Sequence, residues 1–98
     1  MIKIRILKSA KVDLKEGYHF YESQTIGIGT YFLESIYSDI DSLKLFVGIH
    51  PIYFGKYYRL LSKRFPFAIY YCVENNEIKI YSVLDCRRDP AWIKSKLQ

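Results

Sequence analysis

The sequence has little cysteine and histidine, and it lacks any long uninterrupted apolar run. Two cysteines, Cys72 and Cys86, are too few for the disulfide framework of a small secreted domain. The two histidines, His19 and His50, stand far apart and neither has a cysteine at zinc-site spacing, so we expect no metal and no cofactor. No stretch approaches the roughly 20 apolar residues that a transmembrane helix needs.

The N-terminus lacks the continuous apolar stretch of a signal peptide, because residues 1–11 alternate apolar with basic side chains. Nothing in the sequence therefore marks the chain for export or for a membrane, and we expect a cytoplasmic protein with no membrane partner. The length of 98 residues fits one domain, residues 1–98, and a hydrophobic fraction of 50% is enough for a packed core.

Charge and tyrosine are the features that the sequence has in excess. Fifteen Lys and Arg against ten Asp and Glu leave a net charge of +5, which suits an acidic partner such as nucleic acid or an acidic protein segment. Ten tyrosines are unusual in a chain of 98 residues. A tyrosine ring with a polar tip serves a small core or an interface equally well, so both interpretations stay open.

The N-terminal half predicts one strand and a first helix. Residues 2–7 alternate apolar with basic side chains, as in a half-buried strand. Ser9 then offers an N-cap for a helix that runs to about Gln24. Gly17 in that helix costs about 1 kcal/mol relative to alanine, so we expect it to let another backbone approach. Apolar side chains recur along the helix at steps of four and three: Ala10, Leu14, Tyr18 and Tyr21.

A second helix is predicted from about Gly27 to Phe46, with Gly48 as its C-terminal stop. Its apolar side chains step by three and four: Leu33, Ile36, Ile40, Leu43 and Val47. Because only a few residues join the two helices, they should form an antiparallel hairpin.

The pattern changes from period 3.6 to period 2 after a loop from His50 to about Gly55. Three strands are predicted: Tyr57–Ser62, Phe65–Glu74 and Glu77–Asp85. Two turns join them: Lys63-Arg64 and Asn75-Asn76. Asp89 then caps, and Pro90 starts, a short last helix over Ala91–Leu97.

The element order is therefore β-α-α-β-β-β-α, an α+β fold with the helix hairpin on one face of the sheet. We expect strand 57–62 to run antiparallel to strand 2–7, and the whole sheet to be antiparallel. The predicted core joins the apolar faces of the hairpin to the strands: Leu14, Tyr18, Leu33, Ile36, Ile40 and Leu43 against Phe67, Ile69, Ile78 and Ile80.

Several C-terminal segments carry a family resemblance: Tyr58-Arg59-Leu60-Leu61, Arg64-Phe65-Pro66-Phe67-Ala68-Ile69-Tyr70-Tyr71, Val83-Leu84, Arg87-Arg88-Asp89-Pro90 and Trp92. With this element order, the sequence resembles the RelE/ParE toxin superfamily of bacterial type II toxin–antitoxin systems, and the ParE branch more closely. ParE-type chains typically carry an Arg-Phe-Pro-Tyr-like strand entry and an Arg-Arg-(Asp/Asn)-Pro segment after the last strand. As sequence, the resemblance is concentrated in residues 57–92.

The resemblance implies three functions. ParE-branch members generally poison DNA gyrase by binding it, RelE-branch members cut messenger RNA on the ribosome, and a third possibility is a non-toxic binding module. Cleavage through the 2′-hydroxyl needs a base, an acid and cations. In the C-terminal half, His50 falls in a loop, Glu74 lies beside a turn, where a carboxylate is usually solvated, and Tyr81 is expected to pack on the sheet. The acid–base set of a nuclease is therefore not visible, and we predict no catalytic residue. Contact with RNA or the ribosome is expected only under the nuclease alternative.

The predicted target-binding site is the basic end of the sheet: Arg59, Lys63, Arg64, Arg87 and Arg88, with Trp92 pinning the last helix. Arginine forks bind phosphate or carboxylate groups. The alternative is that these are solvated charges, some of them paired with Asp85 or Asp89.

The second partner that the resemblance implies is a cognate antitoxin. Such antitoxins wrap a flexible and often acidic segment around the toxin, pack a helix on the hairpin and sometimes add a strand. Amphipathic rings at the hairpin surface would receive it: Tyr18, Tyr21, Tyr31 and Tyr37. Completion of the chain's own core is the alternative role for these rings. The target, whether DNA gyrase or another macromolecule, and the identity of the antitoxin stay open.

Overall fold

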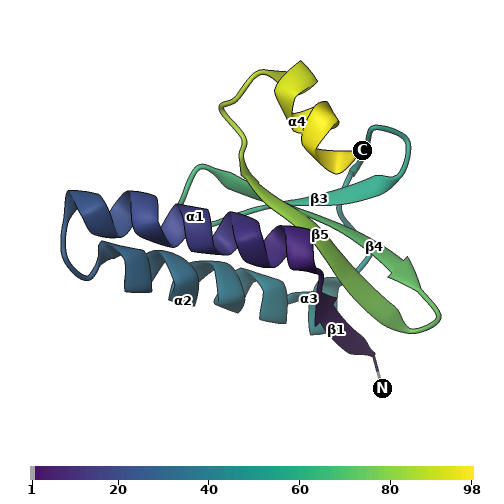
Figure 1. The fold of residues 1–98 in the computed structure, drawn as a ribbon. Helices are drawn as coiled ribbons and strands as arrows, with labels where there is room; N and C mark the ends of the chain where they lie inside the picture. The colour runs from purple at the N-terminus through teal and green to yellow at the C-terminus, as the bar shows by residue number, and fades with distance from the viewer. Residues whose placement is uncertain (1) are drawn as a thin grey trace.

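The structure is a computed structural model that describes residues 2–98. The hairpin of helices α1 and α2 lies on one face of a five-stranded sheet, and α4 packs on the other face (Figure 1). The predicted α+β fold is confirmed. The elements in chain order are β1 (Lys3–Ile6), α1 (Lys8–Gln24), α2 (Ile28–Asp41), α3 (Leu43–Phe46), β2 (Ile52–Tyr53), β3 (Tyr57–Leu61), β4 (Phe67–Glu74), β5 (Glu77–Asp85) and α4 (Pro90–Leu97).

The sheet is mixed, with strand order β1-β5-β4-β3-β2. β1 pairs in parallel with β5, with Ile4 opposite Ile78, and the other pairs are antiparallel. The prediction of an antiparallel sheet, with the 57–62 strand opposed to the first strand, is therefore wrong. The reason is β2, a two-residue strand within the predicted loop, because its hairpin with β3 adds one reversal of the chain.

The helix hairpin departs from the prediction at two points. The helix predicted over 27–46 is interrupted at Ser42, whose hydroxyl donates to the Asp39 carbonyl at 2.6 Å and competes with the regular helical pattern. The first helix starts at Lys8, one residue before the predicted cap. Ser9 therefore caps nothing, and its hydroxyl donates instead to the Tyr81 carbonyl of β5 at 2.5 Å.

The main core lies between the hairpin and the sheet, and most of the predicted face is buried there. Tyr18, Leu33 and Phe67 are only half-buried. The sequence pattern missed Phe32, which is fully buried, whereas it placed the neighbouring Leu33 in the core. The buried members of this core are Ala10, Leu14, Phe32, Ile36, Ile40, Leu43, Ile69, Tyr71, Ile78, Ile80 and Val83.

Two glycines allow the helices to cross closely. A Cβ at Gly17 would lie 2.6 Å from two ring carbons of Phe32. The group that packs against Gly17 is therefore a side chain, and our prediction that a backbone approaches there is wrong. The backbone approach occurs at Gly29 on α2, where a Cβ would lie 2.7 Å from the Tyr18 carbonyl oxygen. The short distance between α1 and α2 therefore depends on both positions lacking a side chain.

A β-bulge in β5 changes which of its side chains face each side of the sheet. Tyr70 pairs with Ser82 but Tyr71 pairs with Ile80, so Tyr81 is an extra residue that shifts the alternation of inward side chains. A second core lies on the other face of the sheet under α4, where the Tyr57 hydroxyl donates to the Leu97 carbonyl at 2.7 Å. Its buried members are Tyr57, Ala68, Tyr70, Cys72, Leu84, Ile93 and Leu97.

The local signals of the C-terminal half are confirmed. Asn75 and Asn76 both have positive φ, 51° and 61°, as a two-residue hairpin turn requires. The Asp89 carboxylate accepts a hydrogen bond from the Ala91 N–H at 2.8 Å, and Pro90 occupies the first turn of α4. These short-range devices act within a few residues, which is why the sequence alone could locate them.

Candidate functional site

The topology brings the predicted basic residues to one end of the sheet. Leu61, Ala68 and Leu84 stand side by side on β3, β4 and β5, and the Cys86 N–H donates to the Pro66 carbonyl at 2.9 Å. The β3–β4 turn, which carries Lys63 and Arg64, therefore lies beside the segment after β5, which carries Arg87 and Arg88. Arg59 lies further along β3, opposite Tyr70.

The arginine side chains nevertheless go to separate partners. Arg87 forms a bidentate ion pair with Asp85, in which Nη2 donates to Oδ2 at 2.7 Å and Nε donates to Oδ1 at 3.0 Å. This hydrogen bonding holds the pKa of the Asp85 carboxyl below its usual value. Arg88 stacks on Trp92, with its guanidinium carbon 3.9 Å from the indole centroid. One arginine is therefore neutralised by a neighbouring carboxylate, while the other is held in place with its charge unpaired within residues 2–98.

Arg59 is the most buried of the predicted basic residues. Its guanidinium carbon lies 4.5 Å from the centroid of the Tyr53 ring, and its Nε is buried without a hydrogen-bond partner in the described part of the chain. Burial raises the pKa of the Tyr70 hydroxyl, and the positive charge of Arg59 opposes that shift. Lys63 and Arg64 are exposed on the turn. The predicted set thus forms several separate basic positions and not one pocket.

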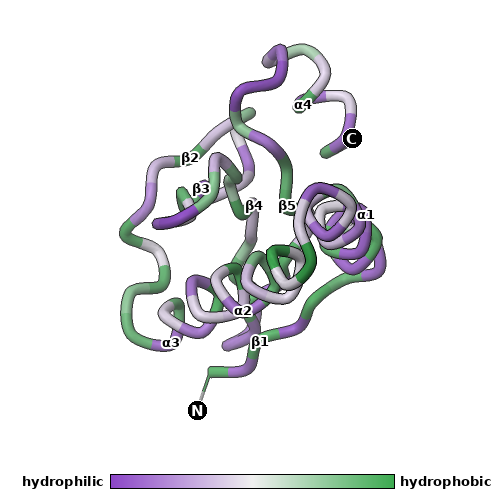
Figure 2. The backbone as a smooth tube through the Cα atoms, turned by 90° about the vertical axis from the view of Figure 1, so that its left-hand side faces the viewer, coloured by the Kyte–Doolittle hydropathy of each residue, from purple (hydrophilic) through white to green (hydrophobic). Residues whose placement is uncertain are grey.

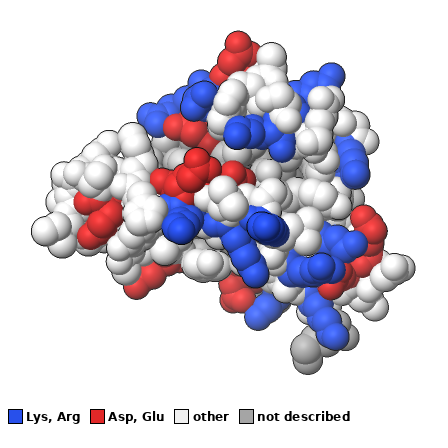
Figure 3. All heavy atoms as spheres, viewed as in Figure 1, with Lys and Arg blue, Asp and Glu red and all other residues white. Residues whose placement is uncertain are grey.

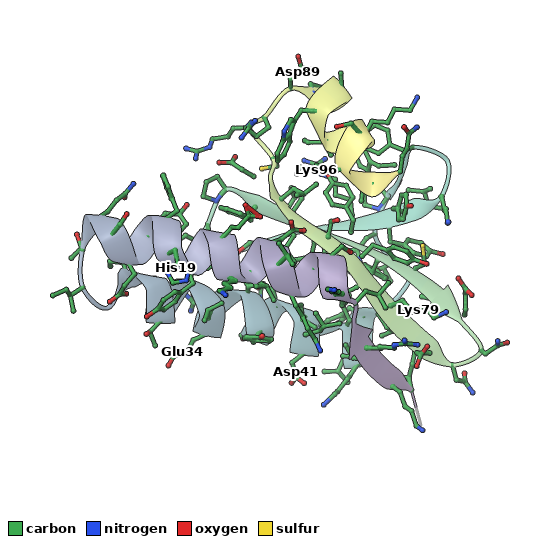
Figure 4. The ribbon with its side chains drawn as sticks, in the orientation of Figure 1. His19, Glu34, Asp41, Lys79, Asp89 and Lys96 are labelled. Atoms are coloured by element: carbon green, nitrogen blue, oxygen red, sulfur yellow. The ribbon has the colours of Figure 1, made fainter. Side chains whose placement is uncertain are left out.

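A cleft of about 250 Å³ separates α1 from α4 above the end of β5. Figure 3 shows acidic and basic side chains next to each other in this hollow, and Lys96 reaches into it from α4 (Figure 4). Its charged and aromatic lining includes Asp13, Glu16, Asp85, Arg88, Trp92 and Lys96. Sequence reasoning did not find the α1 carboxylates, because nothing local indicates which strand they face.

The Asp13 side chain accepts a backbone hydrogen bond from β5 at a position that β1 is too short to reach. Pairing with β1 ends at Ile6 opposite Ile80, and three residues later the Asp13 Oδ2 accepts the Val83 N–H at 3.0 Å. The pKa of the Asp13 carboxyl is raised to about 6, chiefly by burial, which outweighs the hydrogen bond from Val83, and with a smaller contribution from the charge of Glu16.

We predict that Asp13→Asn stabilises the fold at neutral pH. An amide oxygen still accepts the Val83 N–H but carries no charge into the cleft. Because the folded-state pKa of about 6 lies above the ordinary 3.8, the stability that Asp13 contributes below pH 4 is lost as the pH rises to about 6. Urea unfolding should show a variant more stable by on the order of 1–2 kcal/mol at pH 7.5, a figure reduced for solvent screening of the partly exposed carboxyl, and equal to wild type near pH 4. A difference independent of pH would contradict this assignment.

The three side chains considered for acid–base chemistry do not share a site. His50 is hydrogen-bonded through Nδ1 to the hydroxyl of Tyr71, a residue of the main core, and burial lowers the pKa of that imidazole. Tyr81 packs against the second core, on the opposite face of the sheet. Glu74 lies beside the β4–β5 turn and pairs with Lys79 at 3.5 Å. Nothing positions any two of them on one substrate.

The four hairpin tyrosines differ in exposure. Tyr21 turns inward, with its ring centroid 5.2 Å from that of Phe32 and 4.9 Å from that of Phe65. Tyr31 and Tyr37 are exposed on α2. Tyr37 and the half-buried Tyr18 line a hollow of about 270 Å³ between the helices. The remainder of its lining is Lys11, Leu14, Lys15 and Leu33.

The charge that borders this hollow is positive and comes from α1. On α1 the exposed residues Lys11 and Lys15 border it directly. On α2, Glu34 and Asp41 are exposed and project away from α1 (Figure 4). The hairpin therefore presents an apolar groove with a basic rim along α1, while the carboxylates of α2 lie outside the groove.

Within residues 2–98, no group of His, Cys, Asp and Glu side chains is arranged to hold a metal ion. Both cysteines are free thiols, and burial raises the pKa of the Cys72 thiol. The helices of the described chain are too short or too polar for any of them to cross a membrane.

A strand, a helix hairpin, a sheet and a short last helix in this arrangement define a RelE/ParE-like α+β fold. A chain of the chromosomal ParDE TA system from P. aeruginosa matches the structure with a TM-score of 0.78. The match covers 85% of this chain and 94% of that chain at 20% sequence identity, which establishes a shared fold. No protein-family model and no curated protein matches the sequence.

Proposed function

We propose that the chain is the toxin component of a type II toxin–antitoxin system. In this proposal it acts in the cytoplasm, inhibits growth in the manner of ParE by binding a target such as DNA gyrase, and is neutralised by a cognate antitoxin. The observation that carries the proposal is the shared fold with a ParDE chain over 85% of the sequence. The Arg-Phe-Pro segment at 64–66 and the Arg-Arg-Asp-Pro segment at 87–90 support the same assignment.

The proposed target surface centres on Arg88 and Trp92. Arginine and tryptophan are enriched among the residues that dominate binding energy, and the stacking of this pair fixes the guanidinium before a partner arrives. Lys63 and Arg64 add exposed positive charge at the same end of the sheet. Such a surface suits carboxylates of a protein target and requires no proton transfer.

The alternative is a RelE-like endoribonuclease, and Arg59 is the observation that favours it. Its guanidinium faces the side of the sheet opposite the hairpin and keeps one N–H without a partner in the described chain. An arginine on that face would supply positive charge for a phosphate. The wide separation of His50, Glu74 and Tyr81 weighs against this alternative.

Two assays with the purified chain separate these functions. We expect inhibition of DNA supercoiling by gyrase and intact messenger RNA on programmed ribosomes. Site-specific cleavage of the message, abolished by Tyr81→Phe or Glu74→Gln, would instead establish the nuclease. Inactivity in both assays would favour a non-toxic binding module of the same fold.

The proposed antitoxin surface is the hollow between α1 and α2. An amphipathic helix fits such a groove with its apolar face inward. We predict that Tyr37→Glu weakens binding of the protein encoded by the adjacent reading frame at least tenfold, about 1.4 kcal/mol, because a carboxylate would enter an apolar contact. Val12→Glu on α1 is the matched control, since Val12 is 49% exposed and Tyr37 46%, and it lies outside the hollow. Titration calorimetry that gave equal affinities for both variants would place the antitoxin elsewhere.

A further inference from the structure

An apolar surface lies on the segment from α3 through β2, outside the target and antitoxin surfaces proposed above. Five large side chains are exposed there within ten residues, with Leu45 81%, Ile49 72% and Ile52 58% exposed, together with Phe46 and Phe54. Figure 2 shows this segment as a largely green and white stretch of tube along the outside of the molecule between α3 and β2. We call these five residues the apolar edge. A patch of this kind on a small domain marks an interaction site.

The side chains of the apolar edge stand on the surface and do not line a cavity. Leu45 and Ile49 are contacted by little of their own chain, since each is more than two-thirds exposed. The two hollows described above, between α1 and α4 and between α1 and α2, contain none of the five residues. A partner that inserts a side chain therefore finds no pocket in either hollow for this patch, whereas a medium that the apolar side chains themselves enter would accommodate them.

The charge around the apolar edge is predominantly positive. The sequence contains no Asp or Glu from Ser42 to Val73. The same stretch carries five basic residues: Lys44, Lys56, Arg59, Lys63 and Arg64. Lys44 is paired with Asp41 at 2.9 Å, and Lys56 is exposed two residues after Phe54. A partner of the apolar edge therefore meets a positive rim, which attracts an anionic surface.

The free backbone edge beside the patch is too short for a partner that adds a strand. β2 is the last strand of the sheet and spans only Ile52 and Tyr53. The Arg59 N–H donates to the Pro51 carbonyl at 3.0 Å, and Tyr53 is the next residue that faces β3. Within this strand, only the N–H and C=O of Ile52 point away from the sheet. Two of the five apolar side chains lie on the helix α3 instead. An added strand would therefore pair with one residue and leave much of the apolar edge uncovered.

These observations discriminate among the remaining occupants. A second copy of the chain would bring two positive segments together, and neither would offer a carboxylate to the other. An anionic bilayer takes up apolar side chains in its outermost ~5–10 Å and attracts Lys and Arg at its surface. Water and lipid phosphates at that level also satisfy the Ile52 amide, because the headgroup region is not dry hydrocarbon.

We propose that the apolar edge docks the chain on the surface of an anionic lipid bilayer. Leu45, Ile49 and Ile52 enter the boundary between headgroups and acyl chains, and Lys56 lies at the level of the lipid phosphates. The expectation of no membrane partner rested on the lack of an apolar run long enough to span a bilayer, and attachment at the surface needs no such run. The proposal does not depend on whether the chain is a toxin.

Cosedimentation of the full chain with lipid vesicles tests the proposal. The chain should bind vesicles of phosphatidylglycerol and phosphatidylcholine in equal parts, and bind phosphatidylcholine alone at least tenfold more weakly. Raising the salt from about 0.1 to 0.5 M should weaken binding to the anionic vesicles, because the Debye length shortens.

Variants with matched loss of apolar surface locate the contact. Leu45→Ser with Ile49→Ser should bind anionic vesicles at least tenfold more weakly, about 1.4 kcal/mol. Ile26→Ser should bind as the wild type does, because it removes an apolar side chain that is 92% exposed on the distant α1–α2 turn. Equal melting temperatures of these variants show that the fold is kept. Leu45→Ser alone replaces the double variant if that one unfolds early.

A second pair of variants separates the local positive rim from the net charge of +5. Lys56→Gln and Lys94→Gln each remove one exposed positive charge, the first beside the apolar edge and the second on α4. We expect Lys56→Gln alone to lower the affinity for anionic vesicles, by about threefold or more. An equal loss in both variants would show that binding follows net charge, and the assigned surface would be wrong.

Three other results would overturn the proposal. The first is no binding to anionic vesicles at low salt, or binding by the double variant as strong as that of the wild type. The second is a dimer in analytical ultracentrifugation that dissociates in the double variant, which would identify a second copy as the occupant. The third is weaker binding of the protein from the adjacent reading frame by the double variant, with vesicle binding unchanged, which would assign the apolar edge to a polypeptide.

Discussion

Alanine at Gly29 should destabilise the protein by roughly 2–3 kcal/mol, the largest effect that we expect from adding one methyl group to this fold. The added Cβ would lie 2.7 Å from the Tyr18 carbonyl oxygen and 2.8 Å from the Glu22 Cβ, both on α1. Neither atom can rotate away, because one is backbone and the other is attached directly to it. The two helices must therefore separate, and separation loosens the core around Phe32, which is completely buried.

Urea unfolding at constant pH measures this effect. Thr30→Ala is the matched control, because it places alanine at the next position of the same helix, where the side chain is exposed. The control should change the free energy of unfolding by less than about 0.5 kcal/mol, since surface substitutions usually stay within that range. If Gly29→Ala unfolded at the same denaturant concentration as the control, the close packing of α1 on α2 would be incorrect.

Removal of the adjacent arginines, Arg87 and Arg88, should have the largest effect on growth inhibition. We predict that Arg87→Ala with Arg88→Ala lowers toxicity at least tenfold, because Arg88 is held against Trp92 and an arginine at the centre of an interface contributes about 2 kcal/mol or more. Arg59→Ala should act in the same direction but more weakly. The double variant should still fold, since the exposed ion pair between Arg87 and Asp85 contributes little to stability.

Growth inhibition and thermal unfolding, measured together, decide how these arginines act. The matched control is Lys94→Ala, which removes an exposed positive charge from α4 outside the cleft. A double variant with normal melting temperature, normal antitoxin binding and weak toxicity supports a target-binding role. A parallel fall in melting temperature would show a structural role instead, and full toxicity in a folded variant would place the target surface elsewhere.

The parts of the fold that the sequence predicted are those set by neighbours along the chain. Asn75-Asn76 makes a turn and Asp89 makes a cap by contacts within two or three residues. β2 escaped prediction because Ile52 and Tyr53 are too few to show a period, and only pairing with β3 makes them a strand. The direction of the later strands relative to β1 depended on that missing reversal, so this local omission became a topological error.

In the candidate site, too, the features set by neighbours along the chain were predictable and those set by particular tertiary contacts were not. Strand order predicted from turns was enough to bring the β3–β4 turn beside the segment after β5. Which arginine would be neutralised was not predictable, because it depends on the turn in which the Asp85 carboxylate accepts the Arg87 N–H at 2.9 Å. The role of Asp13 also escaped, since the carboxylate serves a strand 70 positions away in the sequence.

Growth of cells that express this chain, alone and together with the adjacent small reading frame, tests the central claim most directly. We predict arrest of growth within a few generations when the chain is induced alone, and recovery when the neighbour is co-expressed. Tyr37→Glu should keep the arrest but reduce the recovery, because the toxin remains active while its antitoxin binds less tightly. Unimpaired growth on induction of a chain shown to be folded and abundant in those cells would contradict the assignment as a toxin.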